Sequence, residues 1–414
     1  MLNWANRFNI FCFMDNNDYQ FETPAFDCML GAGVARSITL TGADPFKDLK
    51  FFFEQKPSWL FGHLGYGLKD LVDGLSSRHK DFIDFEKGFF FEPEIILQIK
   101  GDQLSISGEQ QAGSVIFRNI IDTALEQLEE KQTPVQPRSN MSRQTYIETV
   151  EAIQKHIRRG DCYEINFCQQ FSDHHVNLQP LQTYQQLISL SPNPFSVLYK
   201  LNSKYCLCAS PERYLKKTGN LIISQPIKGT SKRTTDKVTD DENKNYLLTS
   251  AKERSENVMI VDLVRNDLSR ISKKGTVVVE ELFGVYSFPQ VHQMISTIKA
   301  DLADGLHWTD AIRATFPMGS MTGAPKRRVM QLIDQYEPSA RGLFSGSIGY
   351  ITPEANFDFN VVIRSIFYDA ESGNLSFSAG GGITANSNPE DEYTESLLKA
   401  EAMMSVLKKI QTEL

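Results

Sequence analysis

The spacing of the expected strands constrains the fold of this chain more than any other feature of its sequence. In the second part of the chain, short apolar runs meet at tight turns instead of alternating regularly with helices. Strands joined by short turns favour antiparallel sheets in an α+β fold. The expected strands are 197–209, 212–224, 345–352, 359–369 and 374–379, and the expected helices are 142–158, 180–190, 241–270, 308–314, 326–335 and 390–410.

A polar segment with two prolines, residues 131–140, divides the chain and is expected to be a linker. It precedes a helix that starts near Ser142. The sequence before the linker shows helix-like stretches at 45–54 and 114–130 and a strand rich in Phe and Ile at 89–100. We therefore expect an N-terminal subdomain at 1–130 and a catalytic region at 141–414, where the chemical motifs lie.

The composition excludes several classes of partner. The formal net charge is -8, from 43 basic and 51 acidic residues, so no general field attracts nucleic acid or an anionic membrane. No stretch approaches 18 apolar residues, and the start of the chain lacks the pattern of a secretory signal, so a cytoplasmic protein is expected. The six cysteines are dispersed without Cys-x-x-Cys spacing, which favours buried reduced thiols.

The segment from Glu212 to Lys228 has the sequence of a β-hairpin, with a turn at Gly219-Asn220. This turn places Glu212 across from Ile227 or Lys228, although a slip of one residue would reverse the faces of the side chains. A carboxylic acid beside an amine makes a candidate general acid and nucleophile. An exposed cross-strand ion pair is the alternative interpretation.

Lys228 lies between Pro226-Ile227 and Gly229, where a strand is expected to end. An ordinary lysine amine is neutral in only about one molecule in a thousand at neutral pH. A nucleophilic role for Lys228 therefore requires activation, and we expect burial to lower its pKa. A solvated lysine in a tight turn is the alternative.

The last expected helix places Glu392, Glu395 and Lys399 within one narrow arc beside its core-facing side. A solvated acidic first turn would also explain the two glutamates. The helix at 241–270 carries Glu256 within an apolar stretch, and this carboxylate could join Glu395 in presenting oxygens to a hard cation such as Mg²⁺.

Two glycine-rich segments complete the candidate site. The first, at 316–326, contains Ser320 and leads into a helix, so its amides and hydroxyls can hold an anion. It lacks the Gly-Lys-Ser/Thr ending of a nucleotide P-loop. The second, at 378–383, contains Gly381 and Gly382, which let backbone amides approach a carboxylate closely.

Together these segments closely resemble the chorismate-utilising enzymes, the family of the anthranilate, aminodeoxychorismate, isochorismate and salicylate synthases. The resemblance runs from Gly160-Asp161-Cys162-Tyr163-Glu164-Ile165-Asn166 to Lys399, and it is looser over the first 140 residues. It implies two large, mainly antiparallel sheets packed as a sandwich with helices outside, to which both halves of the chain contribute.

Within this family, lysine in a Pro-Ile-Lys-Gly-Thr motif is typical of aminodeoxychorismate synthase component I, whereas anthranilate synthases typically have alanine there. The resemblance thus implies that Lys228 attacks chorismate as a covalent nucleophile and that Glu212 is the general acid. It also implies magnesium ligands at Glu256, Glu392 and Glu395. The positions that line the chorismate site are Arg364, Gly381, Gly382, Ser320 and Lys399.

Two positions depart from the family pattern. Gln293 stands where a histidine is usual, with His292 one residue earlier. Neighbours on a strand face opposite ways, so Gln293 could supply the substrate hydrogen bond instead. Glu164 stands where aminating members often have glutamine and hydrating members have lysine. It argues against a hydrating enzyme, although a nearby carboxylate could act as a base.

The expected function is the amination of chorismate to 4-amino-4-deoxychorismate for 4-aminobenzoate and folate synthesis. Ammonia is expected from a separate glutamine amidotransferase subunit, because no Cys-His-Glu glutaminase pattern is visible. Two alternatives remain, namely an anthranilate synthase component I and a non-catalytic chorismate-binding regulatory subunit.

Overall fold

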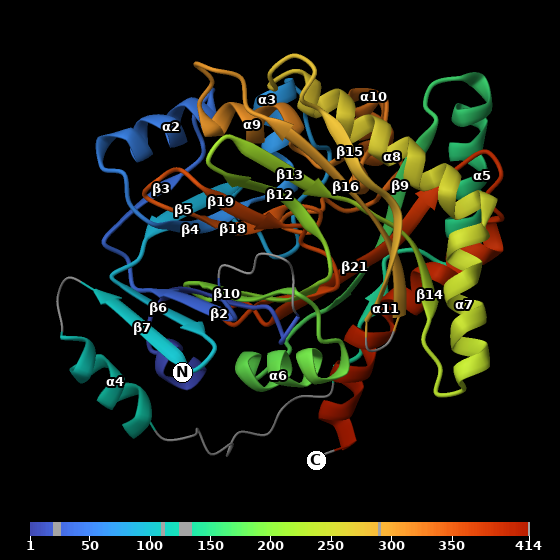
Figure 1. Cartoon of the computed structure of the whole chain (residues 1–414). Helices are drawn as coiled ribbons and strands as arrows, with labels where there is room; N and C mark the ends of the chain where they lie inside the picture. The colour runs from blue at the N-terminus through green and yellow to red at the C-terminus, as the bar shows by residue number, and fades with distance from the viewer. Residues whose placement is uncertain (20–25, 109–111, 124–134, 289–290, 413–414) are drawn as a thin grey trace.

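The computed structural model describes residues 1–19, 26–108, 112–123, 135–288 and 291–412, and within them the chain forms two stacked β-sheets with helices outside (Figure 1). Every pair of neighbouring strands in both sheets is antiparallel over the described residues. The α+β class and the sandwich of mainly antiparallel sheets expected from the sequence are confirmed.

The first sheet has 11 strands within the described residues. In spatial order they are β17 (Gly323–Ala324), β9 (Glu164–Asp173), β21 (Asn374–Ile383), β20 (Ser365–Asp369), β11 (Lys204–Ser210), β10 (Phe195–Leu201), β1 (Ile10–Asp15), β2 (Cys28–Ala32), β6 (Ile95–Lys100) and β7 (Gln103–Gly108), with β8 (Arg138–Ser139) beside β9.

The second sheet has 10 strands within the same part of the chain. In spatial order they are β14 (Ile227–Lys232), β16 (Val291–Asp301), β13 (Leu221–Gln225), β12 (Arg213–Thr218), β19 (Phe357–Asn360), β18 (Ser347–Ile351), β4 (Leu60–Leu64), β5 (Gly88–Glu92) and β3 (Arg36–Thr39), with β15 (Val278–Ser287) also paired to β16.

Helices cover the outer faces of both sheets (Figure 1). They are α1 (Leu2–Ala5), α2 (Pro45–Gln55), α3 (Lys69–Asp73), α4 (Gly113–Asp122), α5 (Arg143–Arg159), α6 (Pro180–Leu190), α7 (Lys237–Thr249), α8 (Ala251–Ser269), α9 (Trp308–Thr315), α10 (Lys326–Tyr336) and α11 (Pro389–Thr412), with 3₁₀ turns η1 (Tyr66–Leu68) and η2 (Gly319–Met321).

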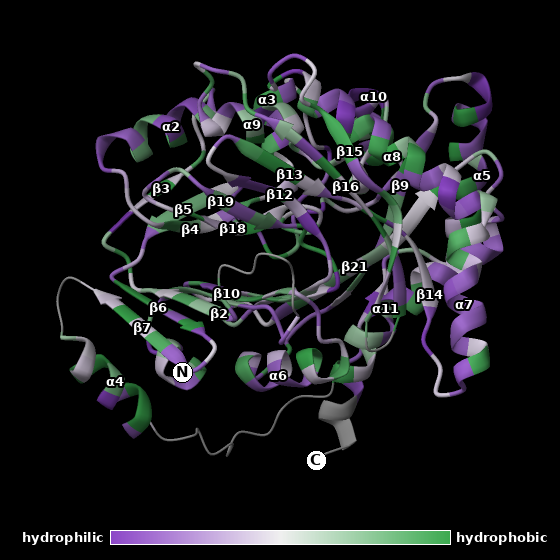
Figure 2. Ribbon diagram, viewed as in Figure 1, coloured by the Kyte–Doolittle hydropathy of each residue, from purple (hydrophilic) through white to green (hydrophobic). Residues whose placement is uncertain are grey.

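The sheets hold the core because their strands are apolar on both faces. In β10, Val197 and Tyr199 pack into the core that the two sheets share, whereas Leu198 packs on the other side, with residues of α6 and α11. A strand buried on both faces becomes a continuous apolar run, and such a run hides a turn. The single strand expected at 197–209 was wrong for this reason, since it is two strands, β10 and β11, which pair antiparallel across a turn at Asn202-Ser203. In Figure 2 the outer helix α7 is mostly hydrophilic, and the only residue it buries is Leu247.

The chain crosses between the sheets at two places where the sequence suggests one strand. The expected strand at 89–100 is two strands, β5 and β6, which lie in different sheets on either side of Pro93. The expected strand at 359–369 is likewise β19 and β20, and Arg364 lies between them with φ of 51°. The single-strand predictions were wrong because an apolar run does not show where the chain changes sheets.

The expected helix at 241–270 is also wrong in one respect, since it is two helices. Ser250 ends α7 and begins α8 in an extended conformation, and its hydroxyl accepts a hydrogen bond from the amide of Glu253. A serine in this position caps the second helix and stops the first.

N-terminal strands belong to both sheets, since β1 pairs with β10 and β4 pairs with β18. The expected boundaries at 130 and 141 therefore separate segments that build sheets together, and residues 131–134 of the expected linker lie outside the described residues.

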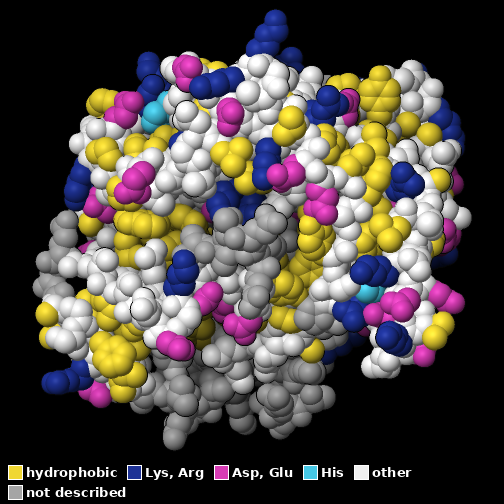
Figure 3. All heavy atoms as spheres, viewed as in Figure 1, with side chains coloured by type: hydrophobic (Ala, Val, Ile, Leu, Met, Phe, Trp, Pro, Cys, Tyr) yellow, Lys and Arg dark blue, Asp and Glu magenta, His cyan; other side chains and the backbone are white. Residues whose placement is uncertain are grey.

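All six cysteines are free, and all but Cys28 are buried. In the part of the chain that the structure describes, no helix is long and apolar enough to span a membrane. On the face drawn in Figure 3, basic and acidic side chains are interspersed.

Candidate active site

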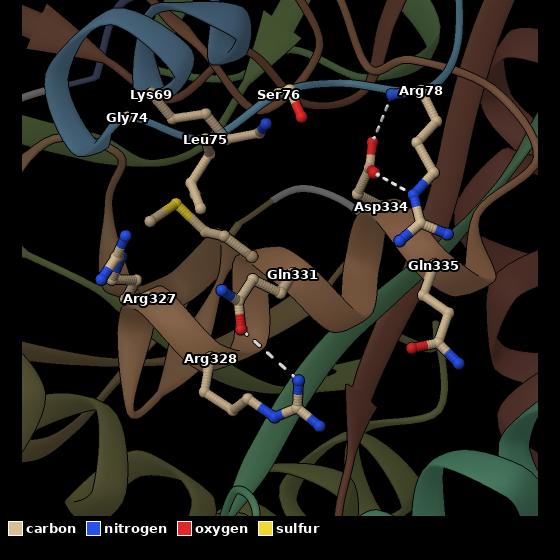
Figure 4. Close-up of a pocket in the computed structure, with 11 residues that line it drawn as sticks. Lys69, Gly74, Leu75, Ser76, Arg78, Arg327, Arg328, Gln331, Asp334 and Gln335 are labelled. Carbon is tan, nitrogen blue, oxygen red and sulfur yellow. Dashed lines mark hydrogen bonds and ion pairs between the residues drawn. The ribbon is translucent and has the colours of Figure 1, made fainter.

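Two cavities lined by several charged side chains are candidates for the functional site. The smaller, of about 370 Å³, lies between α3 and α10, and its basic side chains already have partners (Figure 4). Arg78 pairs with Asp334, and Arg328 bonds with Gln331. The larger, of about 890 Å³, contains Lys228 and most of the other residues that the sequence singles out. The larger cavity is therefore the candidate active site.

The expected hairpin forms as β12 and β13, with its turn at Gly219-Asn220, and Glu212 and Lys228 lie just beyond its two ends. Its register shifts between Arg213 and Lys216, so that Arg213 pairs with Gln225. Continuing this pairing by one residue places Glu212 opposite Pro226. The sequence predicted Ile227 or Lys228 at that position, so the prediction was off by one residue. The backbone N–H of Ile227 donates to the Glu212 carboxyl, and both Glu212 and Lys228 line the same cavity.

A second irregularity aims Lys228 into the cavity. In the pairing of β14 with β16, Ile227 faces Ile295 and Thr230 faces Gln293, so the register changes at Lys228-Gly229. Gly229 adopts φ of 91°, which favours glycine. The bulge leaves the Lys228 side chain 9% exposed and lining the cavity, so the solvated-lysine alternative is wrong.

Glu212 is buried and is close to half protonated at neutral pH. Burial raises the pKa of its carboxyl to about 7, although a hydrogen bond with Ser320 and the charge of Lys228 oppose this shift. Ser320 itself is 5% exposed in η2 and lines the cavity. A buried carboxyl that is partly protonated at pH 7 is suited to general acid catalysis.

The prediction that burial lowers the pKa of Lys228 is wrong for the ligand-free site. Desolvation does favour the neutral amine, but the carboxylates of Glu164, Glu256 and Glu212 outweigh it and raise the pKa of Lys228. Glu164 accepts a hydrogen bond from the ammonium Nζ. The resting enzyme therefore holds its candidate nucleophile as a cation.

Ammonium groups lie among the three predicted metal ligands. Lys252 Nζ lies 3.2 Å from Glu392 Oε1 and 3.9 Å from Glu256 Oε1. The carboxylate of Glu395 pairs instead with Lys399, at 2.7 Å. Within the described residues, no three His, Cys, Asp or Glu side chains are gathered as a metal site.

The donor set still fits a hard divalent cation. Glu256 Oε1 is buried and has no hydrogen-bond partner among the described residues, and Glu392 is 1% exposed. Buried carboxylate oxygens without such partners are suited to Mg²⁺, and an ammonium that now balances their charge could give way to it.

The two adjacent glycines of β21 have different neighbours. A Cβ at Gly382 would lie 2.5 Å from Glu164 Oε1 and 2.7 Å from Lys228 Nζ, so only glycine leaves room for this ion pair. A Cβ at Gly381 would lie 3.1 Å from Glu392 Oε2. Gly382 is part of the cavity wall, whereas Gly381 is not one of its lining residues.

Arg364 and Gln293 present polar groups that no described residue satisfies. Arg364 lines the cavity and forms no ion pair with a described residue, and burial lowers the pKa of its guanidinium. Gln293 is 1% exposed, and its Oε1 has no hydrogen-bond partner in the same set of residues. His292 points elsewhere and bonds with Ser287 and Asp240, so the cavity contains the glutamine.

Sequence reasoning did not find Lys252 or the contact between Glu164 and Lys228. Lys252 is four residues before Glu256 on one helix face, a spacing that could have signalled it. The contact of Glu164 joins β9 of one sheet to β14 of the other, and no local pattern reveals such a pairing.

The fold and the cavity define a class of protein, an α+β sandwich enzyme with a buried lysine, a protonatable carboxyl and an unpaired arginine for an anionic substrate. The chain belongs to the chorismate binding enzyme family, because the sequence pattern of that family matches residues 11–405. The match includes the N-terminal part, where the resemblance of the motifs is looser.

The chain is 38% identical over 325 residues to aminodeoxychorismate synthase component 1 of Escherichia coli (strain K12), covering 77% of this chain and 71% of that protein. It is also 38% identical to the Salmonella typhimurium protein of the same name, covering 76% of this chain and 70% of that one. Anthranilate synthase component I of Streptococcus pneumoniae shares the fold, with a TM-score of 0.80, 24% identity and 93% of each chain covered.

Proposed function

We propose that this chain is an aminodeoxychorismate synthase component I, which converts chorismate and ammonia to 4-amino-4-deoxychorismate. The observation that carries the proposal is the buried Lys228 beside the partly protonated Glu212 in a cavity of about 890 Å³. Its relatives of that name in Escherichia coli and Salmonella typhimurium support the same activity.

In the proposed reaction, the neutral amine of Lys228 attacks C2 of the chorismate ring, and the hydroxyl at C4 leaves. Glu212 supplies the proton that the departing oxygen needs. Ammonia then adds at C4 and expels the lysine, which restores the free amine. A covalent intermediate of this kind divides one difficult displacement into two easier ones.

The substrate is a dianion, and the cavity offers it Arg364 and Lys399. Glu256, Glu392 and Glu395 would hold Mg²⁺. When bound, the ion would supply positive charge for the ring carboxylate of the substrate. Gln293 would accept a hydrogen bond from a substrate hydroxyl at its unsatisfied Oε1, Ser320 would line the substrate site, and the backbone beside Gly381 and Gly382 allows the substrate to approach closely.

Ammonia is proposed to come from a glutamine amidotransferase subunit, and the product to serve 4-aminobenzoate and folate synthesis in the cytoplasm. The designation component 1 of the two relatives supports a second component.

The test is mass spectrometry of the products that the purified chain forms from chorismate, Mg²⁺ and ammonium. Aminodeoxychorismate should form, and Lys228→Ala should abolish it. Lys217→Ala is the matched control, because Lys217 is also buried but bonds with Ala355 away from the cavity. Anthranilate as the main product, or chorismate recovered unchanged after binding, would contradict the proposal.

A further inference from the structure

The reaction scheme leaves one buried carboxylate of the site without a role. Glu164 lies in β9, with its side chain 1% exposed and its Oε1 against Lys228 Nζ. Its other oxygen, Oε2, is buried and has no hydrogen-bond partner among the described residues. Asn166 and Cys168, on the same side of the strand, line the cavity, so Glu164 lies behind Lys228 at its edge.

The fold builds this contact from two sheets. Glu164 comes from one sheet and Lys228 from a bulge in the other, and Gly382 leaves the space in which the two side chains meet. No other carboxylate of the described residues lies within ion-pair distance of Lys228 Nζ. Among the described residues, Glu164 is therefore the one acid or base that can exchange a proton with Lys228 by direct contact.

Lys228 must lose a proton before it can attack, and the surroundings restrict where that proton goes. Glu212 has to carry a proton for the leaving oxygen, so it cannot take another. Release to solvent would leave the buried Glu164 carboxylate beside a neutral amine, and an unpaired buried charge of this kind strongly destabilises a folded protein. Transfer to Glu164 converts a buried ion pair into two neutral groups and leaves the total charge unchanged.

We propose, on the basis of the proposed function, that Glu164 is the catalytic base that deprotonates Lys228. The proton passes from Nζ to the Glu164 carboxylate, and the nitrogen lone pair forms the bond to C2. The two ring double bonds each shift towards C4, the C4–O bond breaks, and its electron pair leaves with oxygen, which takes the Glu212 proton and departs as water. Ammonia then adds at C4, the C2–N bond breaks to release the Lys228 amine, and the new ammonium returns a proton to Glu212. The proton on Glu164 returns to Lys228 when the product leaves.

Two measurements on Glu164→Gln distinguish two roles for this carboxylate. It is either a catalytic base for Lys228 or a charge that only keeps the Lys228 amine protonated. The first is labelling of Lys228 in the resting enzyme by an amine-reactive reagent at pH 8, followed by peptide mass spectrometry. The second is turnover with chorismate, Mg²⁺ and ammonium. Glu164→Gln should label faster than wild type, because the paired carboxylate is gone, yet its turnover should be slower by about 10²-fold or more.

A matched control is Glu354→Gln, which removes the carboxylate of an exposed glutamate outside the cavity. Its turnover should stay within about threefold of wild type, and Glu164→Asp should retain more activity than Glu164→Gln.

Faster labelling with equal or faster turnover in Glu164→Gln would overturn the inference, as would unchanged labelling. If wild type forms aminodeoxychorismate and Lys228→Ala does not, the proposed function stands even when Glu164→Gln is fully active. If wild type forms no aminodeoxychorismate, the proposed function itself fails.

Discussion

Replacing Glu212 with glutamine should remove the descending limb of the pH–rate profile. The carboxyl is 4% exposed, and burial raises its pKa to about 7. An acid with this pKa is protonated in about 90% of molecules at pH 6 and in about 10% at pH 8. The rate of wild type should therefore fall about tenfold between these values, and Glu212→Gln, which cannot donate, should lose about 10²–10⁴-fold at pH 6.

The assay is kcat/KM for chorismate, because this constant reports the ionisation of the free enzyme. The concentration of dissolved ammonia, rather than total ammonium, has to be the same at every pH. Ser320→Ala provides a directional control, since its hydroxyl lowers the pKa of Glu212 and its loss should move the limb to higher pH. A wild-type rate that does not fall above pH 7, or a limb that persists in Glu212→Gln, would refute the assignment.

Unfolding provides a check that needs no substrate. Because the folded protein has the higher pKa at Glu212, the neutral carboxyl contributes its full stability below the unfolded value near 4.5, and this contribution is lost as pH rises towards 7. The difference in the free energy of unfolding between wild type and Glu212→Gln should accordingly change by about 3 kcal/mol across that interval.

Three further substitutions test the site and its support. Gly382→Ala should lower turnover by about 10²-fold in the product assay, because its Cβ would lie 2.7 Å from Lys228 Nζ; near-normal turnover would contradict this. Lys252→Met should tighten Mg²⁺ binding roughly fivefold by calorimetry, since its ammonium lies 3.2 Å from Glu392 Oε1; weaker binding would contradict it. Arg341→Met should lower the free energy of unfolding by about 3–5 kcal/mol in urea titration, because it leaves a buried carboxylate unpaired; a loss below 1 kcal/mol would count against this.

Local patterns in the sequence predicted the elements of the fold more closely than their assembly. The helix expected at 180–190 is α6, Pro180–Leu190, and the one expected at 326–335 is α10, Lys326–Tyr336. Periodicity and proline positions determine such boundaries locally. The crossings at Pro93 and Arg364 depend instead on partners far away in the sequence, which a continuous apolar run does not identify.

The same distinction applies to the site. Glu212 and Lys228 flank the two ends of one hairpin, so their placement in the same cavity could be predicted from a turn. The charge on Lys228 could not, because it depends on Glu164 from the other sheet and Glu256 from a helix. The sequence indicated that Lys228 is buried, which lowers the pKa of its amine. It did not reveal the neighbouring carboxylates, which raise that pKa by more.

The charges of the cavity also explain why the proposed cation and the substrate should bind together. Seven acidic and six basic side chains line it, so the cavity is close to electrical balance before any ligand enters. A dianionic substrate would upset this balance, and its cost in a partly desolvated site is large unless positive charge enters as well. A divalent cation held by Glu256 and Glu392 would restore the balance, and a proton moved within the Lys228–Glu164 pair would leave it unchanged. A site organised in this way can produce a neutral nucleophile without ever holding an uncompensated buried charge.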